Sequence, residues 1–240
     1  MKATKWKSYS LALIAGMSVL TACSSDDNND NGGNGNNGNG NEIENGTTLK
    51  GTITSDVTLT AGSTYKLSGE YIVEDGATLN IEAGVKIISI YDDIVDYILV
   101  KQGGKINAVG TSSAPIVMTS EKEEPGAWGG IHICGKAHTN AEGGKGSSEI
   151  GGATYGGNDD ADNSGTLKYV RVEYSGYAFD SEHEANGITF YGVGNGTTVE
   201  YCQAYKGSDD GFEFFGGSVN VSNLVSVSCS DDSFDWTEGW

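Results

Sequence analysis

Short runs of alternating apolar and polar residues begin at Leu49 and continue to the end of the chain. The runs are rich in Val, Ile, Thr and Tyr, and Gly, Asn or Asp interrupts them every few residues. Long segments with the 3.6-residue period of an amphipathic helix are missing from this part of the sequence. Because alternation with a period of two is typical of strands, the pattern predicts an all-β chain.

The predicted strands recur at a nearly constant offset. Residues 199–217 align with 221–239 at an offset of 22, and residues 186–192 align with 210–216 at an offset of 24. Looser copies, about 24 to 28 residues apart, lie at 76–81, 104–109 and 128–133. One coil of such a repeat cannot close a core and stacked coils supply it, so these units indicate a parallel β-helix, which is a solenoid.

Alternation within the copies sorts their side chains into an inward and an outward set. We expect two inward columns: Ile188, Phe212 and Phe234 in one, and Phe190, Phe214 and Trp236 in the other. Stacked aromatic residues of this kind are typical of a core. We therefore favour a core over a sugar-binding platform as the interpretation of both columns.

The first 22 residues have the composition of a targeting signal. Three lysines precede an apolar stretch at 11–20, and Leu-Thr-Ala at 20–22 leads to Cys23. This arrangement resembles a bacterial lipoprotein signal, which implies cleavage before Cys23 and acyl chains on that residue. An ordinary secretory signal with an incidental cysteine is the alternative. The apolar stretch is too short to remain as a membrane-spanning helix.

A polar linker is expected after Cys23. The sequence Ser-Ser-Asp-Asp at 24–27 resembles the acidic export signal of Bacteroides-group lipoproteins, which implies an outer-membrane anchor and a domain facing the cell exterior. Residues 28–41 are nearly all Asn and Gly, a composition that cannot bury enough apolar area to fold. We assign 1–22 to the signal peptide and 23–46 to a lipidated, flexible tether.

A long insertion divides the rest of the chain. We expect β-helix coils at 47–135 and 166–240, separated by a Gly-, Asn- and Asp-rich insertion at 136–165 with few apolar residues and no strand pattern. No polar helix or irregular segment follows the last copy of the repeat. Because an uncapped coil leaves apolar interior and strand edges open, we expect further coils and a cap beyond Trp240 in a longer protein.

Composition and charge narrow the possible partners. The chain has 37 Gly but only 2 Pro and no Gly-X-Y period, which excludes a collagen. Its formal net charge at pH 7 is -19, from 14 basic and 33 acidic residues. A surface this negative repels phosphate backbones, so we expect no nucleic-acid partner and look to cations instead.

Several Gly- and Asp-rich motifs point to a known family. They are Gly76-Ala77-Thr78-Leu79, Gly103-Gly104-Lys105-Ile106, Ala127-Trp128-Gly129-Gly130, Tyr155-Gly156-Gly157, 160–165 and 209–217. On these motifs the chain from about Leu49 to Trp240 resembles a family of surface lipoproteins of the Bacteroides group. The resemblance implies a right-handed parallel β-helix, similar in architecture to pectate lyases. It implies no particular reaction, because a fold does not carry a function with it.

Six carboxylates gather where consecutive copies of the repeat stack. The alignment gives three stacked pairs: Asp209 with Asp231, Asp210 with Asp232, and outward-facing Glu213 with Asp235. Charges one coil apart, about 4.8 Å, repel by roughly 3 kcal/mol at an effective dielectric near 20. Ca²⁺ accepts about six to eight hard oxygen ligands. We expect it at Asp209, Asp210, Asp231 and Asp232, and a solvated acidic turn is the alternative.

A second acidic site is predicted in the insertion. Asp160, Asp162 and Ser164 place oxygens at positions 1, 3 and 5 of a loop with Gly165 at position 6, as in calcium loops. Position 12 of such a loop requires Glu, and this chain has Arg171 there. An atypical calcium site is one interpretation, and a hydrogen-bonded turn is the other.

Enzyme signatures are few. A calcium-dependent polysaccharide lyase of similar fold needs a basic side chain beside the metal, for which Lys206 and Lys168 are the local candidates. Arg171, the only arginine, lies on another strand column. A glycoside hydrolase would use Glu213 and Asp235 as its pair of carboxylates.

Histidines and cysteines add no catalytic pattern. Three histidines without ligand-like spacing are expected at the surface or in turns: His132, His138 and His183. Besides Cys23, the chain has three cysteines that we expect as buried free thiols: Cys134, Cys202 and Cys229. A disulfide between the last two is the alternative, because the compartment permits it.

Two classes of function remain. We expect a non-catalytic surface protein, anchored in the outer membrane by its lipid, that binds glycan or an outer-membrane protein. Ca²⁺ is its expected cofactor, and we expect no organic one. The alternative is a calcium-dependent lyase or another glycan-active enzyme, which would leave new unsaturated or reducing ends on the glycan.

Overall fold

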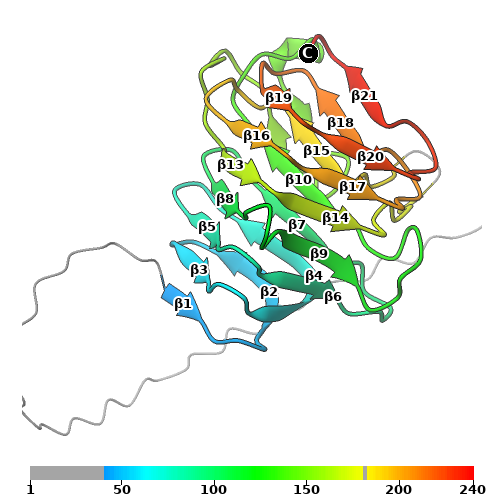
Figure 1. The fold of residues 1–240 in the computed structure, drawn as a ribbon. Coiled ribbons are helices and arrows are strands. Elements are labelled where there is room, and N and C mark those ends of the chain that lie inside the picture. Colours follow the sequence, from blue (N-terminus) through cyan, green and yellow to red (C-terminus); the bar gives the residue numbers. More distant parts are fainter. Residues whose placement is uncertain (1–40, 181–182) are drawn as a thin grey trace, which may run out of the picture. The chain divides into compact units, whose positions relative to one another are not determined.

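The computed structural model describes residues 41–180 and 183–240, which fold as a stack of coils (Figure 1). The predicted signal peptide, Cys23 and most of the predicted tether lie outside these residues. Among the described strands, every named pair except β11 with β12 is parallel. The arrangement confirms the predicted all-β parallel β-helix. No helix in the described part of the chain is long and apolar enough to cross a membrane.

Each coil contributes strands to three faces. The first face is a seven-stranded sheet of β1 (Asn41–Ile43), β3 (Val57–Leu59), β5 (Thr78–Ile81), β8 (Lys105–Val109), β13 (Gly165–Lys168), β16 (Thr198–Glu200) and β19 (Asn220–Ser222). The other two faces share a twelve-stranded sheet and meet in β4 (Thr64–Val73) and its partner β2 (Thr48–Ile53). Gly69, with φ of +72°, lies in β4 between the part that pairs on one face and the part that pairs on the other.

The second and third faces continue from β4 in opposite directions. The second face adds β6 (Lys86–Ser89), β9 (Ile116–Ser120), β14 (Val170–Glu173), β17 (Gln203–Tyr205) and β20 (Val225–Val227). The third face adds β7 (Tyr97–Val100), β10 (Ile131–Cys134), β15 (Ile188–Tyr191), β18 (Phe212–Phe215) and β21 (Phe234–Thr237).

Strand register confirms the two strongest repeats. Phe212 pairs with Phe234, which is the offset of 22, and with Ile188, which is the offset of 24. The looser copy at 128–133 was assigned wrongly. Residues 76–81 and 104–109 pair on the first face, whereas Ile131 pairs with Ile98 and Ile188 on the third. All three faces have the same alternation, so a short motif does not reveal its face.

The inward columns form part of the core. The inward residues of β15 and β18 are fully buried: Ile188, Phe190, Phe212 and Phe214. Phe190 stacks on Phe214 with ring centroids 5.1 Å apart. Phe234 and Trp236 keep the predicted register but are 40% and 61% exposed, because β21 is the edge strand of its face. Trp240 rather than Trp236 stacks on Phe214, at 4.3 Å.

Single residues with positive φ turn the chain between faces. We call the first corner the column between the first and second faces, made by Tyr169, Tyr201 and Asn223. The second corner, between the second and third faces, contains Tyr174, Lys206 and Ser228. Their φ values lie between 52° and 61°. The left-handed region is unfavourable for residues with a Cβ, so these turns are held by the coils on either side.

The insertion covers part of the outer side of the third face. Two short strands, β11 (Gly146–Ser147) and β12 (Thr154–Tyr155), form an antiparallel pair after the 3₁₀ turn η1 (Glu142–Gly144). Apolar residues of the insertion pack there against third-face residues, in a cluster that includes Ile150, Ala153, Tyr155, Leu99, Cys134 and Tyr191. Strands of two residues are too short to show alternation, so no periodic pattern predicts them.

The histidine expectation was wrong for His132. This residue is on the outward side of β10, but it is 0% exposed because aromatic side chains, including Tyr97 and Tyr191, cover it. Burial lowers the pKa of His132 to about 4, which keeps the imidazole neutral. His138 is half-buried and His183 is exposed, as expected.

The three cysteines in the described residues are free thiols, which excludes the alternative disulfide there. Cys134 and Cys202 are buried, and burial raises the pKa of each thiol to about 12. Cys229 is only partly buried.

Candidate functional site: a carboxylate cluster

Stacking of β18 and β21 brings acidic side chains together on the outer side of the third face. The apolar residues Phe212 and Phe214 of β18 point inward, so Glu213 between them points outward. The register pairs Glu213 with Asp235 on the next coil. The register confirms the predicted stacking of Glu213 on Asp235.

Five carboxylates form the cluster. Ligand atoms of Asp209, Asp210 and Asp231 lie within 4.8 Å of one another, and so do those of Asp210, Glu213 and Asp235. Asp210 belongs to both groups, so we call the five residues the carboxylate cluster. Asp210 is 8% exposed. Asp231 is exposed, so the cluster extends from a buried floor to solvent.

Asp232, the fourth predicted ligand, takes a different place. Its backbone N–H donates a hydrogen bond of 2.8 Å to Oδ1 of Asp210. Its own carboxylate is exposed and belongs to neither group of close ligand atoms. The backbone of Asp232 therefore holds the Asp210 carboxylate in place. Glu213 and Asp235, rather than Asp232, supply the other carboxylates close to Asp210.

Asn186 supports the cluster from a buried position and was not singled out in the sequence. Its Nδ2 donates to Oε2 of Glu213 at 2.5 Å. Its Oδ1 accepts the backbone N–H of Asp210 at 3.2 Å. Asn186 aligns with Asp210 at the offset of 24. The repeat therefore predicts that Asn186 lies one coil away from Asp210, but it does not predict the hydrogen bonds that Asn186 makes.

Glu149 brings a further negative charge from the insertion. Burial is the main reason that the pKa of Glu149 is raised, and Asp210 and Glu184 add to the effect, whereas His183 opposes it. Nothing in the sequence placed Glu149 near residues about 60 positions away. The contact depends on how the insertion folds back on the third face, which a repeat pattern does not describe.

The carboxylate cluster holds protons at neutral pH. Burial, the largest cause, together with the charges of Glu149, Asp210 and Asp235, raises the pKa of Glu213 to about 9. Burial also raises the pKa of Asp210 to about 7 and that of Asp209 to about 6. Bringing like charges together in a partly shielded site is unfavourable, so protonation or a bound cation must relieve it.

The donor set of the cluster fits a hard divalent cation. All five side chains offer carboxylate oxygens, which Ca²⁺ prefers, and neither group contains the His or Cys ligands that select zinc or copper. Ca²⁺ accepts about six to eight oxygens with tolerant geometry. Because Asp231 is exposed, a cation here would have positions open to oxygens of a ligand.

The basic residues considered for catalysis do not join the cluster. Lys206 is at the second corner, where its Nζ lies 5.2 Å from the ring centroid of Tyr205 and 5.9 Å from that of Tyr174. Arg171 on the second face has its Nε 2.6 Å from Oε1 of Glu173. No described hydrogen bond or ion pair joins either side chain to the cluster.

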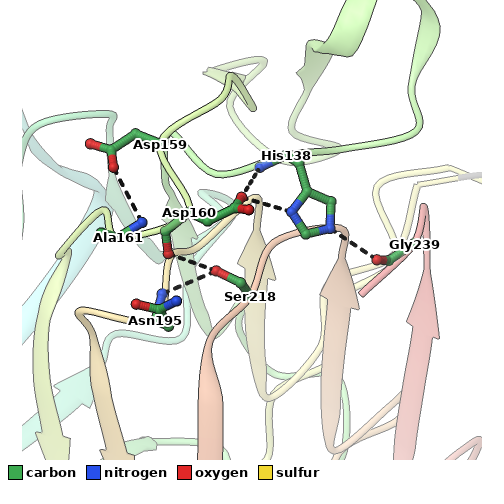
Figure 2. Close-up of polar contacts among 7 residues, drawn as sticks. All are labelled: His138, Asp159, Asp160, Ala161, Asn195, Ser218 and Gly239. Carbon is green, nitrogen blue, oxygen red and sulfur yellow. Dashed lines mark hydrogen bonds and ion pairs between the residues drawn. The ribbon is translucent and has the colours of Figure 1, made fainter.

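The second predicted calcium loop is held by hydrogen bonds. Figure 2 shows Asp160 facing His138, whose Nδ1 lies 2.7 Å from Oδ1 of Asp160 and whose Nε2 lies 3.1 Å from the carbonyl oxygen of Gly239. The Asp160 carbonyl accepts the hydroxyl of Ser218 at 2.8 Å. The hydrogen bond to Asp160, followed by that to Gly239, raises the pKa of His138.

Ser164 and Asp162 of that loop also bond to each other. Ser164 Oγ donates to Oδ2 of Asp162 at 3.3 Å. Neither Asp160 nor Asp162 belongs to a group of three close acidic or histidine ligands in the described residues. The structure thus forms the hydrogen-bonded turn that was the alternative interpretation of this loop.

Comparison with known proteins agrees with the architecture. Residues 51–240, well over half of the chain, match the model of a family described as a pectate-lyase like beta helix domain. No curated protein and no solved structure matches the chain.

Proposed function

The chain belongs to the pectate-lyase-like β-helix family, and we propose that it is a non-catalytic surface protein that binds acidic glycans through Ca²⁺. The carboxylate cluster is the observation that carries this proposal. Asp209, Asp210, Asp231, Glu213 and Asp235 would hold the ion. A uronate or other anionic sugar could then approach a protein with a net charge of -19, because the cation supplies the attraction that the surface lacks.

Binding is favoured over lyase chemistry because neither Lys206 nor Arg171, which were considered as the base, joins the cluster. A lyase requires a side chain that removes the proton next to the uronate carboxylate. Lys206 lies against Tyr205 and Tyr174 instead, and Arg171 is ion-paired with Glu173 on another face. These positions keep Lys206 and Arg171 away from the cluster, whose carboxylates are suitable ligands for a cation.

Glycoside hydrolysis is the second candidate, supported by one observation. The raised pKa of Glu213, about 9, keeps this residue protonated at neutral pH, as a general acid requires. Asp235 lies on the next coil in register with it. Any stacked pair of carboxylates would have this spacing, so the pair alone does not identify a hydrolase.

Glycan retention with and without calcium tests the proposed function. We expect the domain to bind immobilised alginate or polygalacturonate in excess CaCl₂ and to be released by EDTA, because the cation bridges two anionic partners. Products are assayed in the same samples. Unsaturated uronates would support a lyase, new reducing ends without unsaturation would support a hydrolase, and binding that survives EDTA would exclude a calcium bridge.

We also propose that a lipid on Cys23 anchors the protein to the outer membrane, with the domain facing the exterior. The proposal rests on the basic and apolar segments before Cys23 and the Ser-Ser-Asp-Asp sequence after it. Several acyl chains give stable attachment because each buried methylene contributes about 0.8 kcal/mol. Residues 24–27 would direct export.

Substitution of the anchor residue tests this proposal in cells. We expect Cys23→Ser to yield a released protein or an unprocessed precursor, as seen by membrane fractionation and labelling with a fatty-acid analogue. Cys229→Ser is the matched control and should remain in the membrane. External protease should degrade the wild-type protein on intact cells; degradation only after the outer membrane is broken would contradict exposure to the exterior.

A further inference from the structure

Two tyrosines form an exposed stack at the first corner, away from the carboxylate cluster. The rings of Tyr169 and Tyr201 have centroids 4.7 Å apart and planes only 9° apart. Tyr201 is 42% exposed. The next residue of the column is Asn223, whose short side chain leaves no ring over the other face of Tyr201 among the described residues. The stack therefore ends in an open ring face.

A groove adjoins this open face. It has a volume of about 330 Å³ and is lined by residues of the first corner and the second face, including Tyr169, Tyr201, Arg171, Gln203, Asn223 and Val225. This size lies at the lower end of the range of small-molecule sites, about 300 to 1,000 Å³. An aromatic floor with a few polar groups at its rim is also typical of such sites.

The polar groups at the groove suit an uncharged ligand rich in hydroxyls. Gln203 and Asn223 offer amides that both donate and accept hydrogen bonds. Nε of Arg171 is 2.6 Å from Glu173, and its guanidinium carbon lies 4.6 Å from the centroid of Tyr205, so the group is held in place. The charge of Arg171 is thus balanced by a neighbouring glutamate.

The charge of Lys168, which lies next to the groove, is balanced by a carboxylate in the same way. Lys168 Nζ lies 2.9 Å from Oε2 of Glu200 and 5.8 Å from the ring centroid of Tyr201. With each cation paired to a carboxylate, the groove carries little net charge. It therefore differs from the cluster on the third face, which would require a cation to attract an anionic sugar.

The backbone at the corner gives a second reason to look for a ligand. Tyr169 and Tyr201 have φ of 52° and 54°, in the left-handed region that favours Gly and Asn. Asn223 occupies the same corner one coil further on, so an asparagine is compatible with this turn. Tyr201, whose ring is 42% exposed, bears a backbone cost that burial does not offset, and strain of this kind gathers at binding sites.

We infer that the groove at the first corner binds a neutral pyranose unit of a glycan. The apolar face of the sugar ring continues the stack on Tyr201, and its hydroxyls exchange hydrogen bonds with Gln203, Asn223 and the Arg171 guanidinium. The site is independent of the carboxylate cluster and of Ca²⁺. The protein would thus contact glycans at two places, one selective for anionic and one for neutral sugars.

Binding of neutral polysaccharides in EDTA tests this inference. The probes are an immobilised mannan, a xylan and a β-glucan, with association measured by biolayer interferometry. We expect at least one to bind the wild-type protein, and Tyr201→Asn to weaken that binding by about tenfold or more. Tyr201→Phe keeps the ring face and should bind within about threefold of wild type. Tyr91→Asn, which removes another exposed ring, is the control and should have no effect.

The outcomes separate this inference from the proposed function. Asparagine fits the corner, so Tyr201→Asn should melt as cooperatively as wild type; if it does not fold, Tyr201→Ala and Tyr201→Phe provide the comparison of absent and retained ring. Failure of all three neutral glycans to bind, or equal binding by wild type and the ring-deleted variant, would overturn the inference. Neither result would affect calcium-dependent retention of alginate.

Discussion

The Glu213→Gln variant should be more stable than wild type at pH 8 to 9 when calcium is removed. The pKa of Glu213 is about 9 in the folded protein against 4.5 for an ordinary glutamate. Between these values the folded state binds more protons than the unfolded state, so stability is full below about pH 4.5 and falls as the pH rises toward 9. The slope from this group is at most about 1.4 kcal/mol per pH unit and is reduced by solvent screening.

Asp209 and Asp210 should also contribute to the loss of stability, over a narrower range of pH. The pKa of Asp210 is raised to about 7 and that of Asp209 to about 6, so their part of the loss is nearly complete by about pH 8. Above about pH 8 the remaining slope belongs mainly to Glu213. Glutamine removes this titration and keeps an oxygen that can accept the hydrogen bond from Asn186 Nδ2.

Urea unfolding in EDTA at several pH values measures this effect. Wild type should lose stability from pH 6 to pH 9, whereas Glu213→Gln should show a flatter profile and a higher midpoint at pH 9. Glu123→Gln, which changes an exposed glutamate outside the cluster, is the control and should follow wild type. Parallel profiles for wild type and Glu213→Gln would show that Glu213 is not forced to hold a proton.

The repeat predicted the fold because its two patterns agree. The period sets which residues stack on the next coil, and the alternation sets which of them point inward. An offset of 22 places Phe212 on Phe234, and alternation then fixes Glu213 and Asp235 on the outer side. Register is a local property, since a slip of one residue would exchange the inner and outer faces. The same logic predicted that Asp209 stacks on Asp231, and their ligand atoms lie within 4.8 Å of each other.

The sequence could not show how irregular segments fold back on the coils. The insertion carries Glu149 to the cluster and contains a hairpin with two-residue strands, and neither feature leaves a periodic signal. Asp232 was misjudged for a related reason. Its position in the repeat is that of Asp210, but the turn directs its backbone N–H to the cluster and its carboxylate to solvent.

The exposed tyrosine stack was also beyond the reach of the repeat. Tyr169 and Tyr201 are 32 residues apart because the loop before β15 lengthens that coil, so they fall outside the offsets of 22 and 24. Their stacking at the first corner becomes visible only in the folded structure. Both residues have positive φ, which shows that they occupy the same corner position in successive coils.

Asp210→Asn is expected to cause the largest loss of calcium affinity, because Asp210 belongs to both groups of close carboxylates. A ligand that binds only the folded state stabilises it by RT ln(1 + [L]/Kd), about 2.7 kcal/mol when its concentration is 100 times Kd. Wild type should therefore melt at a higher temperature in calcium than in EDTA, and Asp210→Asn should lose that gain.

Calcium titration by isothermal calorimetry, on wild type and three variants, tests the central claim most directly. The variants are Asp210→Asn in the cluster, Asp232→Asn beside it, and Asp162→Asn in the hydrogen-bonded loop. If the carboxylate cluster holds the ion, wild type, Asp232→Asn and Asp162→Asn will bind calcium with similar affinity and Asp210→Asn will bind at least about tenfold more weakly. Absence of calcium binding by wild type, or unchanged binding by Asp210→Asn, would contradict a cation site in the cluster.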